Sequence, residues 1–193
     1  MSRPPLAKPL ADPLESSLDR ATLRARLDRL DRHLLLGVCR FHSRLATRIL
    51  SALTRLGDPA SWAVVCLVLA GSGGEGPKNA RLLAEAAIGA VLLSQILKRL
   101  WNRPRPAASG LQGFSALVES PDAFSFPSGH TAVAFAIAVA LAGAGQGLGA
   151  LMLALAPAIA ISRVYLGAHY PLDVLAGSLV GTAVGLGVRA LAG

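Results

Sequence analysis

Residues 148–191 read LGALMLALAPAIAISRVYLGAHYPLDVLAGSLVGTAVGLGVRAL, two long apolar stretches joined by a short polar segment. The stretches Leu148–Val164 and Leu172–Leu191 have the apolar composition of membrane-spanning helices. The segment SRVYLGAHYPLD, residues 162–173, places an arginine, a histidine and an aspartate where these helices meet. Charged side chains beside hydrocarbon are costly, so this group predicts a functional site at one face of a membrane.

The composition of the whole chain agrees with a membrane protein. Of its 193 residues 53% are hydrophobic and 16% are charged, and the mean hydropathy is +0.52. Further apolar stretches occur at Ala60–Gly71, Leu82–Leu97 and Thr131–Ala144. We therefore predict an all-α fold, a polytopic membrane helical bundle of about five to six spanning helices. Gly177, Gly181 and Gly185 repeat along one face of the last helix, which predicts close packing within the bundle.

Residues 1–58 form a basic region before the first apolar stretch. They contain 11 of the 19 Lys and Arg residues and 6 of the 11 Asp and Glu residues. Two amphipathic helices are predicted here. In the first, leucines form one face, and Arg24, Asp28 and Asp31 lie on the opposite, solvent-facing side. In the second, an apolar face lies opposite a face of arginines. We expect both helices in the membrane interface against anionic lipid, with a cap that faces solvent as the alternative.

Several partners and cofactors are not expected. The basic region lacks the interleaved aromatic side chains typical of nucleic-acid binding, so no nucleic-acid partner is predicted. Cys39 and Cys66 are too few for a metal site, and their spacing indicates no disulfide. We expect neither a metal nor another cofactor. The first residues lack an apolar stretch followed by a cleavage site, so no removable signal peptide is predicted.

The direction of the predicted helices brings distant residues to one side of the membrane. Lys98 ends the second spanning helix, His130 begins the third, Arg163 ends the fourth, and His169 with Asp173 begins the fifth. If successive helices alternate in direction, all five residues lie on the side that also holds the long loop 107–126. The sequence therefore predicts one site assembled from segments far apart in the chain.

The residue types at this site suit a phosphoryl group. Ser128 is a candidate N-cap of the third spanning helix, where Gly129 would help to present free backbone N–H groups at the positive end of the helix. Lys98, Arg105 and Arg163 add cations that suit the equatorial oxygens of a phosphoryl group in transfer. Without a counter-anion these cations would repel one another. An ordinary capped helix start is the alternative.

His169 and Asp173 form a candidate catalytic pair. They are four residues apart at a predicted helix start and therefore share a face. Asp173 would accept a hydrogen bond from one ring nitrogen and leave the other free as a nucleophile, as in catalytic triads. His130 would protonate the departing alkoxide and then activate water. An interfacial polar contact is the alternative for the His–Asp pair.

Together the motifs resemble those of a known family. Lys98-x6-Arg105-Pro106, Pro127-Ser128-Gly129-His130 and Ser162-Arg163-x5-His169-x3-Asp173 are similar, in order and spacing, to the signature motifs of the type 2 phosphatidic acid phosphatase superfamily, which includes vanadium haloperoxidases. The resemblance covers roughly residues 82–185. It implies a metal-independent phosphatase in a helical bundle, with nucleophile His169, orienting partner Asp173 and acid and base His130. It implies that phosphate is bound by Lys98, Arg105, Ser128, Gly129 and Arg163. Residues 59–193 are then the phosphatase domain.

Four nearby residues are expected outside the catalytic set. Arg103-Pro104 duplicates Arg105-Pro106, and the family spacing selects Arg105. Arg103, like Arg99, is therefore expected at the surface or on lipid headgroups. Trp101 and Tyr170 are expected to be interfacial anchors.

The resemblance and the site together predict a lipid phosphatase that acts through a phosphohistidine. Its substrate would be phosphatidic acid, phosphatidylglycerophosphate or a similar membrane lipid. An undecaprenyl diphosphate phosphatase is the nearest alternative, and a haloperoxidase or a non-enzymatic anion-binding membrane protein are more distant ones. The resemblance to small bacterial members implies a bacterial inner-membrane protein. Most Lys and Arg lie on the side of the site, which predicts a cytoplasmic site, although similar bacterial members often face the periplasm. The oligomeric state is left open.

Overall fold

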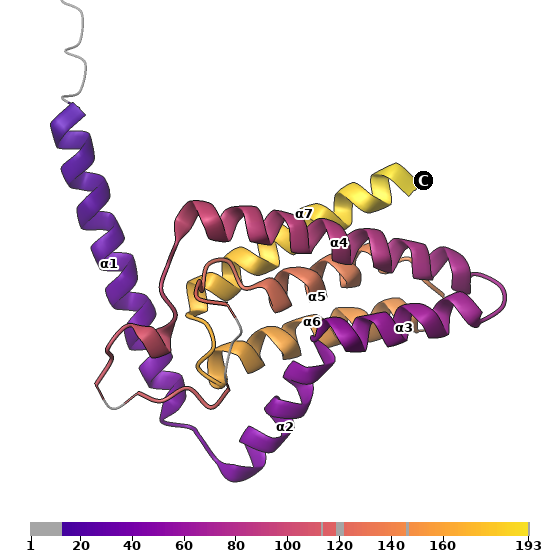
Figure 1. Cartoon of the computed structure of the whole chain (residues 1–193), viewed down its shortest axis with the longest axis horizontal. Coiled ribbons are helices and arrows are strands. Elements are labelled where there is room, and N and C mark those ends of the chain that lie inside the picture. The colour runs from indigo at the N-terminus through magenta and orange to yellow at the C-terminus, as the bar shows by residue number, and fades with distance from the viewer. Residues whose placement is uncertain (1–12, 113, 119–121, 146, 193) are drawn as a thin grey trace, which may run out of the picture.

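The computed structural model describes residues 13–112, 114–118, 122–145 and 147–192, with side chains from residue 22 onward. Within these ranges all regular structure is helical (Figure 1). The elements are α1 (Pro13–Cys39), α2 (Arg44–Leu56), α3 (Pro59–Gly71), α4 (Gly76–Trp101), the 3₁₀ turn η1 (Pro106–Ala108), α5 (Gly129–Ala140), α6 (Leu148–Tyr165) and α7 (Pro171–Ala192). The all-α prediction is confirmed. Four of the predicted apolar stretches lie within α3, α4, α6 and α7, whereas the stretch Thr131–Ala144 extends beyond α5, which ends at Ala140.

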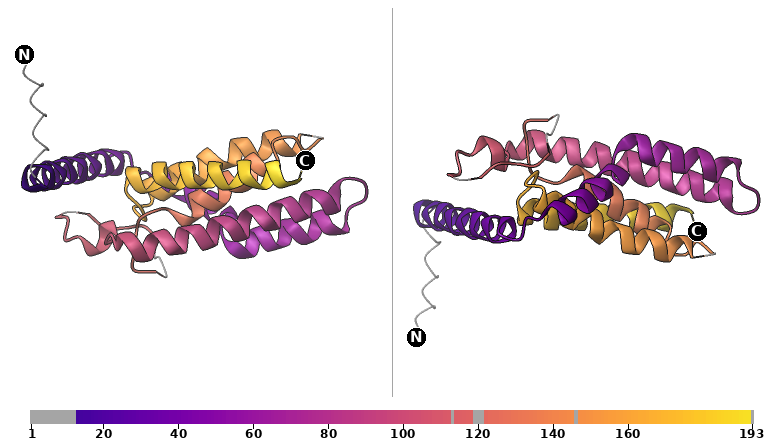
Figure 2. Two further views of the ribbon diagram at one scale, coloured as in Figure 1. Left: turned by 90° about the horizontal axis from the view of Figure 1, so that it is seen from above. Right: turned by 90° about the horizontal axis from the view of Figure 1, so that it is seen from below.

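Helix α5 is the centre of the bundle. It packs against α4, α6 and α7, while α3 packs against α4 (Figure 2). Its sequence GHTAVAFAIAVA is apolar on all sides, as expected for a helix surrounded by others, and Ala132, Ala136 and Ile137 are fully buried. The surrounding helices carry the exposed apolar side chains, such as Leu92 and Leu179, that suit a lipid environment.

The predicted glycine face of α7 packs against α5. A Cβ atom added at Gly177 would lie 2.6 Å from the Ser128 carbonyl oxygen, and one added at Gly185 would lie 2.6 Å from the Ala136 carbonyl oxygen. Only hydrogen fits between backbones at such separations. The prediction of tight packing within the molecule is confirmed.

The helices differ in their capacity to span a membrane. Among the described residues α4, α6 and α7 are each long and apolar enough, and α2 with α3 forms a fourth candidate span bent by 57°. Helix α5 is shorter, with 12 residues. Because α5 is enclosed by its neighbours, its length need not match the hydrocarbon thickness. Ser128, directly before α5, is buried, whereas Ala142 and Gly143 after it are exposed.

The two N-terminal helices lie at one end of the bundle. Helix α1 crosses that end at a steep angle to α3–α7, and α2 runs obliquely from it to α3 (Figure 1). The leucine stripe of α1, which includes Leu23 and Leu30, is exposed. The expectation that Asp31 lies on the solvent-facing side is wrong, because Asp31 is 0% exposed. Helix α1 turns its acidic side toward the bundle, where an arginine offsets the cost of burying a carboxylate.

Candidate active site

The predicted site residues gather at the end of the bundle that α1 crosses. A cavity of about 850 Å³ opens there between α2, α3, α4 and α5. Its wall includes six of the predicted residues: Lys98, Arg105, Gly129, His130, Arg163 and His169. Ser128 and Asp173 are buried and are not part of the cavity wall. The predicted helix directions therefore placed distant residues together correctly.

His169 lies in the turn between α6 and α7 and is 1% exposed. The turn depends on Gly167, whose φ of 74° favours glycine. The His169 Nδ1 atom is 2.8 Å from the Ser125 carbonyl oxygen, which can only accept a hydrogen bond. Nδ1 therefore carries the proton, and Nε2 keeps its lone pair 3.3 Å from Nη1 of Arg105. A free ring nitrogen beside a cation is the arrangement that a phosphate-attacking histidine needs.

Asp173 does not accept a hydrogen bond from the ring as expected. Its Oδ2 atom is 3.8 Å from Nδ1 of His169 and accepts the Tyr170 N–H at 2.9 Å. The expectation assumed helical geometry from His169 onward, but α7 begins only at Pro171. Asp173 can therefore affect the ring through its charge and through its hydrogen bond to the turn at Tyr170. The Ser125 carbonyl oxygen is the direct hydrogen-bond acceptor for Nδ1 of His169.

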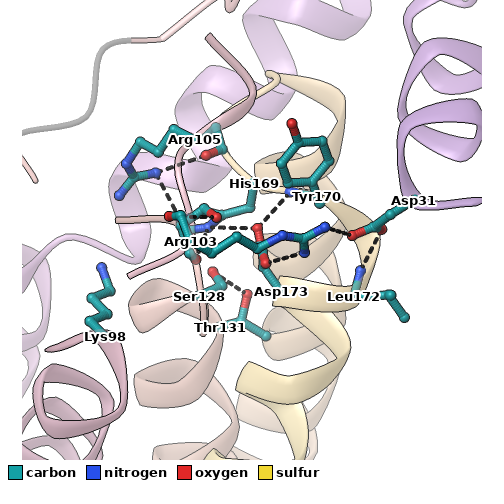
Figure 3. A network of polar contacts seen from close by, with 12 residues as sticks. Asp31, Lys98, Arg103, Arg105, Ser128, Thr131, His169, Tyr170, Leu172 and Asp173 are labelled. Carbon is teal, nitrogen blue, oxygen red and sulfur yellow. Dashed lines mark hydrogen bonds and ion pairs between the residues drawn. The ribbon is translucent and has the colours of Figure 1, made fainter. Parts of the chain in front are cut away.

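Arg103 occupies a different place from the one predicted. Its side chain is 13% exposed, Nη1 donates to Oδ1 of Asp173 at 2.7 Å, and Nη2 is 2.7 Å from Oδ2 of Asp31 (Figure 3). Its guanidinium carbon lies 4.3 Å from the ring centre of Tyr170. The expectations of a surface Arg103 and an interfacial Tyr170 are wrong. The signal that could have indicated Arg103 is Asp173 itself, since a carboxylate at the start of an apolar helix needs a cationic partner.

The missing counter-anion of the cations is Asp122, which the sequence analysis did not single out. Its carboxylate forms ion pairs with Lys98 and with Arg105. Arg105 Nε also donates to the Asp122 carbonyl oxygen at 2.8 Å. Burial disfavours the charge of Asp122, yet hydrogen bonds from Lys98 and Arg105 lower the pKa of its carboxyl below the usual value. A carboxylate thus lies where two cations meet at the cavity.

Arg163, like Lys98, is a deeply buried cation of the cavity wall and is 4% exposed. Nη1 donates to Thr54 Oγ1 of α2 at 2.7 Å. Among the described residues no acidic side chain forms an ion pair with it, and its buried Nε has no hydrogen-bond partner. A buried guanidinium with an unused donor is costly by itself, so the cavity is suited to receive an anion.

His130 begins the first turn of α5, where its ring meets an acidic partner that the sequence analysis did not identify. The Nε2 atom is 2.8 Å from Oδ1 of Asp58, the N-cap residue of α3. Burial and the positive charge of Arg163 disfavour a charged His130 ring, whereas the Asp58 carboxylate opposes them and favours the protonated form that a general acid requires. Ser128 occupies the predicted N-cap position, but its hydroxyl accepts from Thr131 Oγ1 and makes no capping hydrogen bond. The first backbone N–H groups of α5 therefore have no side-chain cap and are available to an anion.

The donor set of the cavity is cationic. Within the described part of the chain, no group of three or more His, Cys, Asp or Glu side chains could hold a metal ion. Lys98, Arg105 and Arg163 lie near the start of α5, and this combination of cations and backbone N–H groups is chemically suited to a tetrahedral oxyanion.

Comparison with known proteins gives the family. The model of the PAP2 superfamily matches residues 79–192, which include most of α4, all of α5 to α7 and every site residue that the sequence predicted. This chain belongs to the PAP2 superfamily. Among curated proteins, a bacitracin transport permease protein BcrC from Bacillus licheniformis is 38% identical over 107 residues, covering 54% of this chain and 52% of that protein. The match thus spans about half the length of this PAP2 relative.

Solved PAP2-like structures resemble the chain over most of its length. The crystal structure of Aquifex aeolicus LpxE has a TM-score of 0.72 and 29% identity, over 82% of this chain and 94% of that one. A transmembrane PAP2-type phosphatidylglycerolphosphate phosphatase from Bacillus subtilis has a TM-score of 0.71 and 23% identity, over 94% and 96%. The second likeness concerns the fold alone. With its apolar helices, the chain is a membrane protein of this superfamily.

Proposed function

We propose that the chain is a metal-independent lipid phosphatase that hydrolyses a phosphomonoester or diphosphate bond through a phosphohistidine. The observation that carries the proposal is that one cavity contains both the unprotonated Nε2 of buried His169, 3.3 Å from Nη1 of Arg105, and the unused donor of buried Arg163. The site thus contains a candidate nucleophile and a group of anion-binding donors, one of which has no hydrogen-bond partner.

The first step forms a bond between Nε2 of His169 and phosphorus and breaks the bond from phosphorus to the leaving oxygen. His130, protonated beside Asp58, gives its proton to that oxygen. The substrate phosphate takes the place of the Asp122 carboxylate on Lys98 and Arg105. Arg163 and the N–H groups at Gly129 bind the remaining oxygens.

The second step regenerates the enzyme. His130, now neutral, takes a proton from water, the water oxygen attacks phosphorus, and the bond to Nε2 breaks. Inorganic phosphate is released and His130 is again protonated. Asp173 stabilises the positive ring of His169 while the phosphoryl group is attached, since its carboxylate is 3.8 Å from Nδ1.

The cavity supports a substrate with a hydrocarbon tail. Beyond the cations its wall includes many apolar side chains from α3 and α4, among them Trp62, Leu83, Ile88 and Leu92. Ile88 and Leu92 are also exposed at the lipid-facing surface, so a tail can leave the cavity between these helices. Phosphatidic acid or phosphatidylglycerophosphate fit this shape. Arg55, a further cation of the wall, suits the second phosphate of undecaprenyl diphosphate as the alternative substrate.

For location, the proposal is a bacterial inner membrane, with α1 and α2 in the interface at the cytoplasmic face. The basic helices and the described residues of the loop between α4 and α5 lie at the site end, while Lys78 and Arg189 lie at the opposite end of α4 and α7. This distribution agrees with the positive-inside rule. Residues 1–58 then form a basic anchor for the phosphatase domain 59–193.

The decisive experiment is phosphate release by purified protein in chelator, without added metal. The substrates are phosphatidic acid, phosphatidylglycerophosphate, undecaprenyl diphosphate and a water-soluble phosphate ester. We expect release from a lipid substrate that vanadate inhibits and that His169→Gln reduces by about 1,000-fold or more, because the nucleophile is lost. His33→Gln, at an exposed position of α1, is the matched control. Hydrolysis by His169→Gln at the control rate would refute the phosphohistidine.

A further inference from the structure

An ion network joins α1 to the segment that carries His169 and Asp173 (Figure 3). Arg103 lies at its centre, and its Nη1 donates to Oδ1 of Asp173 at 2.7 Å. Its Nη2 donates to Oδ1 of Asp28 at 3.0 Å and forms an ion pair with Oδ2 of Asp31 at 2.7 Å. One guanidinium thus connects two acidic residues of α1 with the carboxylate nearest the His169 ring.

Asp31 makes a second contact with the same segment. Its Oδ1 atom accepts the backbone N–H of Leu172 at 2.9 Å. Leu172 lies in the first turn of α7, where N–H groups have no acceptor within the helix. Asp31 therefore caps α7 from a different helix, between His169 and Asp173 in sequence.

Burial makes this network sensitive to the loss of any member. Asp31 and Asp173 are both 0% exposed, and a buried carboxylate is costly unless cations and N–H groups surround it. Burial raises the pKa of Asp31, while Leu172 N–H and Arg103 act in the opposite direction. If Asp31 loses its charge, α1 no longer holds Arg103 through a buried ion pair, and the guanidinium is free to move with Asp173.

We propose that Asp31 and Arg103 are positioning residues of the phosphatase and that α1 is, through them, part of the active site. Arg103 holds Oδ1 of Asp173 so that Oδ2 remains directed at Nδ1 of His169, and Asp31 fixes both Arg103 and the start of α7. The inference rests on the proposed role of His169 as nucleophile. Neither residue touches the phosphate, so the expected effect is on the chemical step and not on substrate binding.

The test compares Asp31→Asn with Arg32→Gln in the full-length protein. Asp31→Asn keeps the side-chain volume and an acceptor for Leu172 N–H but removes the charge, whereas Arg32 is the exposed neighbour on the same helix. We expect kcat on phosphatidic acid to fall by about 10- to 100-fold in Asp31→Asn with KM within about twofold, because small displacements of reacting groups cost that much. Arg32→Gln should match the wild type in both constants.

A readout independent of turnover separates this inference from the proposed function. In ¹⁵N spectra of detergent-solubilised protein, the ring signals of His169 should shift in Asp31→Asn and remain unchanged in Arg32→Gln. If the wild type hydrolyses no substrate, the lipid phosphatase proposal fails while the spectra still test the positioning role. Unchanged His169 signals or an unchanged kcat in folded Asp31→Asn would overturn the inference.

A third variant covers the case that Asp31→Asn does not fold. Asp28→Asn removes the more exposed partner of Arg103 Nη2, whose side chain is 41% exposed, and leaves the cap of α7 in place. We expect the same His169 signals to shift and kcat to fall by about 3- to 10-fold, consistent with the loss of a single half-exposed ion pair. If Asp28→Asn were then indistinguishable from Arg32→Gln, the inference would be rejected.

Discussion

At the scale of single residues, the site depends on a histidine that stays neutral. His169 is enclosed by protein, and burial lowers the pKa of its ring to about 4, with Arg105 and Arg163 adding to the effect and Asp173 opposing it. The Ser125 carbonyl fixes the proton on Nδ1. The nucleophilic form is therefore present throughout the neutral range, without a separate base to remove a proton from it.

The pH dependence of His169 follows from this environment. We expect the ring to stay neutral as pH falls through the usual histidine value of 6.5 and to protonate only near pH 4. Because the unfolded chain takes up this proton at higher pH, the free energy of unfolding should fall as pH decreases from 6.5 toward 4. ¹⁵N spectra of the ring, assigned with His169→Gln, measure the titration. A midpoint near 6.5 would contradict the burial of this side chain.

At the scale of elements, the contact of α5 with α7 aligns the two parts of the site. Gly129 and His130 begin α5, while Asp173 lies in the first turn of α7. The N–H of Ser128 donates to the Asp173 carbonyl oxygen at 2.9 Å, so the helix starts are joined directly. Close approach along the glycine face of α7 therefore sets the distance between the start of α5 and the proposed nucleophile, His169.

Gly181→Ala should disturb this contact. A Cβ atom at Gly181 would lie 2.9 Å from Cβ of Phe135 and closer still to the Ala132 carbonyl oxygen, so the helices must separate. We expect a loss of about 1–3 kcal/mol in stability, seen as a lower melting temperature in detergent. The control is Gly187→Ala, where no atom lies within 4 Å and the higher helix propensity of alanine should be neutral or stabilising. Equal melting temperatures would show that α5 and α7 are not in close contact.

At the scale of the whole molecule, polar and apolar parts of the proposed substrate site follow one another along the long axis of the bundle. The polar site and the crossing helix α1 occupy one end, while α3 and α4 present an apolar cavity wall along the bundle. A lipid phosphate bound in this way keeps its headgroup at the interface and its tail in hydrocarbon. The side of the membrane that holds this end decides which pool of lipid the enzyme reaches.

The proposed orientation predicts protection of the site-end loop from outside reagents. Ser115 is exposed in that loop, and a cysteine there can be labelled after Cys39 and Cys66 are replaced by serine. A membrane-impermeant maleimide should label Ser115→Cys only after the cells are permeabilised, because the basic end faces the cytoplasm. A cysteine replacing the exposed Gly74 in the loop before α4 is the control for the opposite side. Labelling of Ser115→Cys in intact cells would reverse the orientation.

The sequence by itself determined the apolar helices and the end of the bundle to which each polar motif belongs. Hydrophobic segments have a local signal, and alternating helix direction assigns Lys98, His130, Arg163 and His169 to the same end without knowledge of packing. The family motifs then assigned chemical roles to these residues, and those roles remain predictions.

Only the tertiary structure decided which charges are paired. Asp58 with His130, Asp122 with Lys98 and Arg105, and Asp31 with Arg103 join segments between 17 and 72 residues apart. In an amphipathic pattern, an aspartate that faces solvent and one that faces a buried arginine give the same signal, so Asp31 was placed on the wrong side. The difference arises where α1 crosses the end of the bundle, because burial makes an ion pair necessary there and no local pattern records that crossing.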